Sequence, residues 1–489
     1  MRFVVTEARA RSLAAIGLIG LVLAVTANGQ PRSFGPVSLD TVIVGVPLAI
    51  LLCLPYVRRR GLDSVPMYLM GPAALAFISW GLLSVAVDGG QFASLLTMVR
   101  YASYFLLAIA VSVVAQDAQI RRGMLWVVAV TAGLTTVLAL AQYLDPHLTP
   151  GMNGISPEIS TRVVGTFYNS NFYAEYLLLA TGVSAALFFT ERRLARALAA
   201  LLGVMIVVAM LLTYTRGSWI GLAIGLVIFV TVVDVRYLAA VAVAGVAGIL
   251  LVPGVTARLS QSTANSGSAE FRLGIWQIAG QAMRAKPLFG YGAGDFLQAY
   301  RAVVIAHPEL YQGYLGFGAH NSYFELAAEI GIIGGLLFLV VTLGYATRGI
   351  FVATRHGADP AVKYTALALS SAMVGFIANT FTSNTFQHPQ SGLFFWILAG
   401  VVAAVGAGSW QVETRPQACA EVADGSMAAT SRVAPWALAV RGWVGSTWRA
   451  SVCFARTALP KQPRGSWFES SAVLRAIFGA DGADKHSEV

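Results

Sequence analysis

The sequence has little charge and almost no cysteine. Charged residues make up 11% of its 489 residues, whereas soluble globular domains carry about a quarter. Polar groups are therefore too few to cover a water-exposed surface, which excludes an ordinary cytosolic enzyme. The three cysteines, Cys53, Cys419 and Cys453, form no close pair. Their spacing excludes a disulfide framework and a cysteine-ligated zinc site.

Apolar residues, by contrast, are abundant. They make up 57% of the chain and gather in runs close to the roughly 20 residues that a helix needs to cross a bilayer. We therefore predict an all-α polytopic membrane protein with about 12 transmembrane helices. The expected spans are 12–28, 39–57, 65–87, 95–115, 123–144, 170–189, 197–213, 218–233, 237–252, 323–347, 361–381 and 391–409.

Two regions lie outside these spans and set the domain organisation. Residues 253–322 form one long loop, far longer than the usual connection of about 4–6 residues. Within it, residues 268–285 predict a helix, and Pro287 ends it. Phe271, Ile275, Ile278 and Ala282 recur every three or four residues, so they form one apolar face of this helix. We divide the chain into a membrane domain, 1–409, and a cytoplasmic tail, 410–489.

The tail is expected to be partly disordered, because its first part mixes alanine with small polar and acidic residues. Further on, Trp436, Trp443 and Trp448 alternate with arginines. This pattern fits an interfacial helix on the membrane surface. An unstructured tail with incidental tryptophans fits it equally.

Basic residues predict the orientation in the membrane. If the N-terminus is cytoplasmic, clusters such as 58–60, 121–122 and 192–196 all fall on the cytoplasmic side. The long loop and the connections that hold Arg32, Arg162 and Arg216 then lie in the periplasm, and both termini are cytoplasmic. The net charge of +10 is explained in this way, so nucleic acid is not an expected partner. A cleaved signal peptide ending near Ala27 is the alternative for the first span.

Four polar clusters fall on the predicted outer side, at residues 162–171, 213–219, 271–295 and 319–329. Ionisable groups at the ends of membrane helices are costly and indicate function. Arg216 begins a helix, where the helix dipole disfavours a cation, so we expect it to have an anionic partner. An arginine that reaches toward lipid headgroups is the alternative.

His320 is the candidate base, because a neutral imidazole accepts a proton from a hydroxyl. Glu325 and Glu329 lie one helical turn apart, and one of them is expected to orient the imidazole. The alternative is an interfacial histidine without a catalytic role. Neither HExxH nor paired aspartates occur outside, so we predict no metal and no cofactor. The glycines at 290–294 lack the strand that a dinucleotide loop requires and indicate a tight turn instead.

These clusters carry a resemblance to a known family. His320-Asn321, nine residues, Gly331, two residues and Gly334 match a signature of the bacterial O-antigen ligases. The sequence therefore resembles that family and the related lipid-linked polysaccharide polymerases. Residues 165–171 are similar to its GTFxNxN segment and 215–217 to its S/T-R-G segment. Arg272 and Trp276 followed by 290–294 are similar to RxxxW…GxG, and the resemblance covers about residues 160–400.

The resemblance implies a twelve-helix membrane glycosyltransferase, similar to C-type enzymes, at the periplasmic face of the bacterial inner membrane. The donor would be a glycan on undecaprenyl diphosphate. The acceptor would be lipid A–core in a ligase of lipopolysaccharide biosynthesis, or a second lipid-linked glycan in a polymerase of O-antigen or exopolysaccharide. The reaction would be metal-independent and would invert the anomeric centre.

The resemblance also implies roles for individual residues. His320 would activate the acceptor hydroxyl, and Arg216 would take part in catalysis. Guanidinium groups bind phosphate oxygens bidentately, so Arg216, Arg272 and then Arg162 would bind the diphosphate. The residues expected to bind sugar hydroxyls or to support the site are Asn169, Asn171, Asn321, Glu325 and Trp276.

Two alternatives remain open. Some polymerases carry arginine, ten residues and glycine in outer loops, and no outer-side arginine here fits that spacing, which favours a ligase. A transporter or flippase would need ionisable groups near the membrane midplane and repeated halves. Only Arg100 stands out inside a predicted span, and no repeat is evident.

Overall fold

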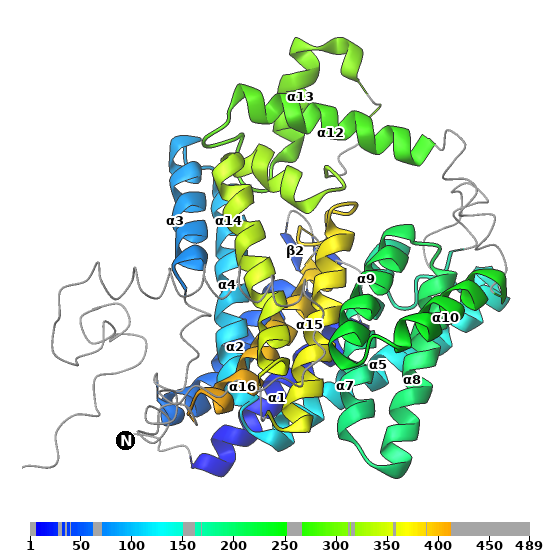
Figure 1. Ribbon diagram of the computed structural model, residues 1–489. Coiled ribbons are helices and arrows are strands. Elements are labelled where there is room, and N and C mark those ends of the chain that lie inside the picture. Colours follow the sequence, from blue (N-terminus) through cyan, green and yellow to red (C-terminus); the bar gives the residue numbers. More distant parts are fainter. Residues whose placement is uncertain are drawn as a thin grey trace, which may run out of the picture. The chain divides into compact units, whose positions relative to one another are not determined.

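The structure is a computed structural model of the chain, and it is almost entirely helical (Figure 1). It divides into two units, residues 1–418 and 419–489, and the residues that the structure describes all belong to the first. They are 6–27, 32–34, 37–39, 41–61, 71–149, 162–167, 169–251, 267–311, 313, 318–355, 358–387 and 389–411. The predictions for the tail beyond Gln411 lie outside them.

Every predicted membrane span coincides with a helix. These helices are α1 (Glu7–Ala27), α2 (Thr41–Arg60), α3 (Pro72–Val87), α4 (Phe92–Val114), α5 (Ala118–Leu144), α7 (Ser170–Thr190), α8 (Arg193–Leu212), α9 (Arg216–Val233), α10 (Tyr237–Leu251), α14 (Ser322–Ala353), α15 (Pro360–Thr380) and α16 (Pro389–Gln411). Among the described residues, nine helices are long and apolar enough to cross a membrane, whereas α3 and α10 are shorter. The prediction of an all-α, multi-pass membrane protein is confirmed.

Short elements fill the connections. One small antiparallel hairpin, β1 (Arg32–Phe34) and β2 (Val37–Leu39), joins α1 to α2; the sequence did not predict it. The 3-10 turn η3 (Pro146–Leu148) follows α5. Several helices start at a side chain that caps their free N–H groups. Asp117, Asn169, Asn321 and Asp359 accept such bonds at the starts of α5, α7, α14 and α15.

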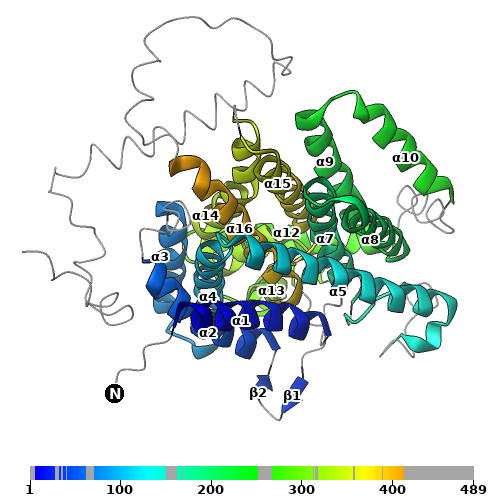
Figure 2. The ribbon, with the colours of Figure 1, turned by 90° about the horizontal axis from the view of Figure 1, so that it is seen from below.

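Helix α15 packs against α7, α9, α14 and α16, and Figure 2 shows it between α14 and α9. Small residues allow the close contact with α9. A Cβ atom on Gly221 would lie 2.5 Å from the carbonyl oxygen of Gly375, and one on Gly225 would lie 2.8 Å from that of Ser371. This small-residue spacing fixes the start of α9 beside the end of α15.

The long loop contains the helix that was predicted for residues 268–285. It forms α12 (Gly267–Ala285), followed by α13 (Phe296–Ala306) and the 3-10 turn η4 (Pro308–Leu310). The expected face is confirmed, because Ile275, Ile278 and Ala282 are buried and Phe271 packs against their cluster. In Figure 1, α12 and α13 lie together beyond the upper end of α14. The cluster includes Ala319 and Ala328, so the loop rests on the start of α14.

Helix α14 is broken at Ile330 and Gly331, and the segment 287–292 fills the break. The φ angle of Gly331 is 84°, in the region that favours glycine. Three carbonyl groups around the break accept bonds from outside the helix: Ala328 from Tyr291 N, Glu329 from Gly292 N, and Ile330 from Trp80 Nε1. Ile332 N in turn donates to Pro287 O at 2.9 Å. The glycine-rich segment that was predicted to be a tight turn therefore completes the backbone hydrogen bonding of α14 at the break. We call residues 287–292 the plug.

Candidate active site

The four polar clusters meet at one end of the bundle. Two of them, at residues 213–219 and 319–329, contact the α15–α16 connection, residues 381–387, which the sequence analysis did not single out. A Cβ atom on Gly217, next to Arg216, would lie 2.4 Å from Asn379 Oδ1 and 2.5 Å from Thr382 Oγ1. On the other side, Ser322 N at the start of α14 donates to Ser383 O at 3.0 Å. The starts of α9 and α14 are thus held by one connection.

A buried carboxylate fixes that connection. Glu175 of α7 has no exposed surface. It accepts hydrogen bonds from Ser383 Oγ at 2.5 Å and from Asn379 Nδ2 at 3.2 Å. Sequence reasoning missed Glu175 because a single acid inside an apolar run carries no spacing signal. The polar run from Asn379 to Thr385 between two spans was the signal that could have found this connection.

The segment before α14 is anchored through both backbone groups of Ala319. Its N–H donates to Glu325 Oε2 at 2.6 Å, and its carbonyl accepts from Trp276 Nε1 at 3.0 Å. Trp276 also packs edge-on against Phe324, with ring centroids 5.9 Å apart. Either Glu325 or Glu329 was expected to orient the imidazole, and the bond that Glu325 makes goes to the backbone N–H of the residue before His320. This clamp fixes the position from which His320 projects.

His320 itself adopts a left-handed backbone conformation with φ 51°. Its ring lies edge-on to Phe271 of α12, with centroids 6.1 Å apart. Burial of the ring, and secondly the positive charge of Arg272, lower its pKa from the usual 6.5 to about 4. The sequence suggested an ordinary value because burial by α12 was not visible there. The structure thus brings His320 and Arg272 together.

Arg162 connects the first two clusters through three hydrogen bonds. Nε donates to Thr213 O at 2.7 Å, and Nη2 donates to Asn171 Oδ1 at 2.8 Å and to Thr215 Oγ1 at 2.9 Å. The guanidinium therefore ties the start of α7 to the turn that precedes Arg216. Tyr214 in this turn has φ 50°. Arg162 therefore stabilises the arrangement of these two segments through hydrogen bonds inside the protein.

The predicted asparagines lie at the same end, and their side-chain oxygens bond inside the protein. Asn169 Oδ1 accepts from Asn171 N, and Asn321 Oδ1 accepts from Tyr323 N and Phe324 N. Asn171 Oδ1 accepts from Arg162. These oxygens set helix starts and turns, which leaves the amide N–H groups as the atoms to offer a ligand.

Replacing Arg162 by alanine is expected to lower the free energy of unfolding by about 3 kcal/mol, because two buried acceptors then lose a charged donor. Lysine should restore only part of this, since one ammonium cannot span all three acceptors. Thermal unfolding of the purified protein measures the effect. Arg236→Ala is the control: its ion pair with Asp234 is largely exposed and contributes little. Equal stability of both variants would contradict the stabilising role of the Arg162 hydrogen bonds.

The described residues contain no group of three or more histidine, cysteine or acidic side chains placed to hold a metal ion. The side chains that the structure shows at this end include guanidinium groups, an imidazole, amides and the carboxylates of Glu175 and Glu325. Guanidinium groups suit a phosphate. Beside them, His320 offers a proton acceptor on a fixed backbone.

Comparison with known proteins points to one family. Residues 200–339 match the family model described as O-antigen ligase, which confirms the resemblance seen in the motifs. The matched stretch contains Arg216, Arg272, Trp276 and His320. Arg162 and the asparagines at 169 and 171 precede it.

Two curated relatives bear the name "putative polysaccharide ligase". The one from Rickettsia felis is 25% identical over 157 residues, which cover 30% of this chain and 39% of the relative. The one from Rickettsia conorii is 25% identical over 155 residues, covering 30% and 38%. The chain thus matches about two fifths of the length of these relatives.

Proposed function

We propose that this protein is a membrane glycosyltransferase that moves a glycan from undecaprenyl diphosphate to a sugar hydroxyl. The observation that carries the proposal is the pairing of His320 with Arg272 on a clamped backbone, at the end of the bundle where α9 begins with Arg216. The match to the O-antigen ligase family over residues 200–339 supports it.

In the proposed reaction the acceptor oxygen attacks the anomeric carbon of the donor sugar. A new C–O bond forms on the face opposite the diphosphate, and the bond from that carbon to the diphosphate oxygen breaks. The configuration therefore inverts. The hydroxyl proton passes to His320 Nδ1 or Nε2, and undecaprenyl diphosphate leaves with the bonding electron pair.

Arg216 and Arg272 would bind the diphosphate. Negative charge on the leaving oxygen grows as the bond breaks, and guanidinium groups placed there stabilise it without a metal ion. Asn169, Asn171 and Asn321 would bind sugar hydroxyls or support the site through their amide N–H groups. Glu325 and Trp276 would support the site by holding Ala319.

The depressed pKa of His320 has a role in this scheme. The positive charge of Arg272 contributes to it, so a bound diphosphate that neutralises Arg272 would raise the pKa again. The imidazole would become a stronger base only when the donor is in place. The histidine would therefore accept the hydroxyl proton most readily when the donor is bound.

A pH profile tests the state of His320. Its pKa in the free protein is lowered, so the neutral form persists as pH falls and is lost only near pH 4. We expect kcat/KM, which reports the free protein, to show no loss from this group between neutral pH and about 5. An inflection near 6.5 that disappears in His320→Asn would contradict the buried, charge-coupled histidine.

We place the reaction at the periplasmic face of the bacterial inner membrane, with both termini in the cytoplasm. Clustered basic residues at the opposite ends of the helices support this orientation. The acceptor we favour is lipid A–core, which makes the protein an O-antigen ligase of lipopolysaccharide biosynthesis. Joining of lipid-linked repeat units by a polymerase is the competing reaction.

A deletion strain distinguishes the two. Loss of long glycan chains from lipid A–core, with lipid-linked polymer accumulating, supports the ligase. Single repeat units without polymer would show a polymerase.

If purified protein moved lipid-linked glycan across liposomes without forming a glycosidic bond, the transferase proposal would be wrong and a transporter would replace it.

A further inference from the structure

A second polar site lies at the opposite end of the helices, far along α7 and α15 from the candidate active site. It is a cavity of about 260 Å³ where α5, α7, α15 and α16 meet. Its polar lining consists of Arg121, Arg122, Thr190, Glu191, Asp359 and Thr365. Apolar side chains complete the walls: Leu125, Leu187, Val362 and Val405.

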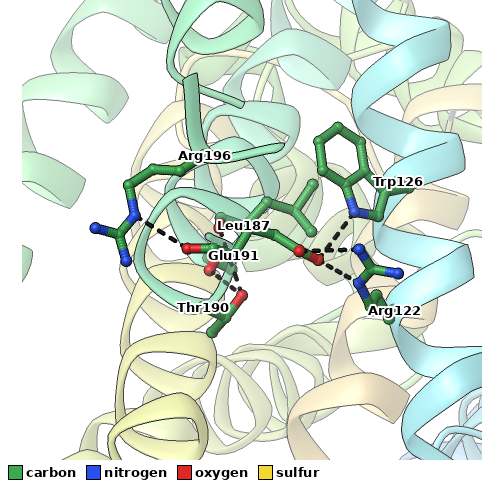
Figure 3. A network of polar contacts seen from close by, with 7 residues as sticks. Arg122, Trp126, Leu187, Thr190, Glu191 and Arg196 are labelled. Carbon is green, nitrogen blue, oxygen red and sulfur yellow. Dashed lines mark hydrogen bonds and ion pairs between the residues drawn. The ribbon is translucent and has the colours of Figure 1, made fainter. Parts of the chain in front are cut away.

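The two carboxylates of the cavity are already engaged, and Figure 3 shows the contacts of Glu191. Glu191 accepts from Arg122 Nη2 at 2.9 Å and from Trp126 Nε1 at 3.0 Å. A second contact joins Arg122 Nε to Glu191, and the pair keeps the pKa of Glu191 below its usual value. Arg196 Nε donates a hydrogen bond to the backbone carbonyl of Glu191 at 3.0 Å. Asp359 Oδ1 caps α15 by accepting from two backbone N–H groups.

Arg121 is the lining cation that these acids do not neutralise. Its Nη1 donates to the Ala115 carbonyl at 2.8 Å, at the end of α4. Asp117, which attracts it, is already paired with Arg11 at 2.7 Å. A guanidinium has five N–H donors, so one bond to a carbonyl fixes the group in place and leaves donors for a ligand.

We propose that this cavity binds the phosphate of an anionic phospholipid headgroup, with Arg121 as the cation that holds it. The volume is small for an organic ligand, since such pockets usually measure about 300–1,000 Å³, but it suits a headgroup. The apolar lining residues Leu125, Leu187, Val362 and Val405 would contact the first carbons of the acyl chains. Arg192, Arg193 and Lys363 lie at the same helix ends and add to the attraction for an anionic surface.

Native mass spectrometry of the full-length protein tests this site. The purified protein is titrated with phosphatidylglycerol, phosphatidylcholine or inorganic phosphate. We expect preferential binding of phosphatidylglycerol, and about a tenfold loss of affinity in Arg121→Gln, which removes one charge-assisted contact. Val405→Trp, which fills the cavity without changing charge, should weaken binding as well and covers the case that Arg121→Gln misfolds.

Arg59→Gln is the matched control, because Arg59 is an exposed arginine at the end of α2. Arg60 beside it interacts electrostatically with Asp117, which places both at the same end of the bundle. Unchanged binding in Arg59→Gln supports the site. An equal loss in that control, no loss in the other two variants, or inorganic phosphate binding as tightly as the lipid would overturn the proposal.

Discussion

Replacing His320 by asparagine is expected to lower glycan transfer by about 10²–10⁴-fold, the usual contribution of a positioned base. Asparagine is the sharper choice than alanine. It tolerates the left-handed conformation at φ 51° and has no basic nitrogen. The clamp on Ala319 does not involve the imidazole, so the fold should survive. Rates are measured with purified protein, a lipid-linked donor and a hydroxyl acceptor.

The control for this prediction is the stability of the same variant. His320→Asn should stay close in stability to the unaltered protein, because asparagine tolerates the left-handed backbone and the two bonds that anchor Ala319 do not involve the imidazole. Full activity in His320→Asn would remove the histidine from the reaction. A variant that lost activity and stability together would show a structural role.

Replacing Gly331 by alanine should have the largest effect on the structure. Its φ of 84° is strained for alanine, and a Cβ atom there would lie 1.8 Å from the carbonyl oxygen of Leu288. We expect a loss of about 3 kcal/mol or more, with displacement of the plug that carries Gly290 and Tyr291. Transfer should fall as well, because α12 and Arg272 are attached through that plug.

The same helix supplies the matched control. A Cβ atom on Gly344 of α14 would meet no other atom within 4 Å, so alanine there should be neutral or stabilise by about 0.5–1 kcal/mol. Thermal unfolding and proteolysis between α12 and α13 report the two variants. Similar stability and similar cleavage of Gly331→Ala and Gly344→Ala would mean that the fold does not depend on the break in α14.

The sequence predicted the elements well because apolar run length and helical periodicity are local signals. The face of α12 formed by Ile275, Ile278 and Ala282 was predicted for this reason. The family signature marked Gly331, but its physical cause was hidden. Only the structure shows that Leu288 occupies the space that a side chain would need.

The partners of polar groups were harder to predict. Glu325 and Glu329 share a face, and sequence alone could not tell that Glu325 binds the backbone of Ala319. Glu175 was missed because its partners, Asn379 at the end of α15 and Ser383 in the α15–α16 connection, lie 204 and 208 residues later in the chain. Such contacts depend on how helices pack, which local patterns do not record.

The most direct test of the account is the rate at which purified protein releases undecaprenyl diphosphate, with acceptor present and divalent metals chelated. Arg216→Gln and Arg272→Gln should each lower this rate by about 10²-fold or more, as expected for losing one preorganised donor to a developing negative charge. Arg59→Gln, at the other end of the bundle, should leave it unchanged. Unchanged release in both Arg216→Gln and Arg272→Gln would contradict the central claim that guanidinium groups beside His320 hold the leaving diphosphate.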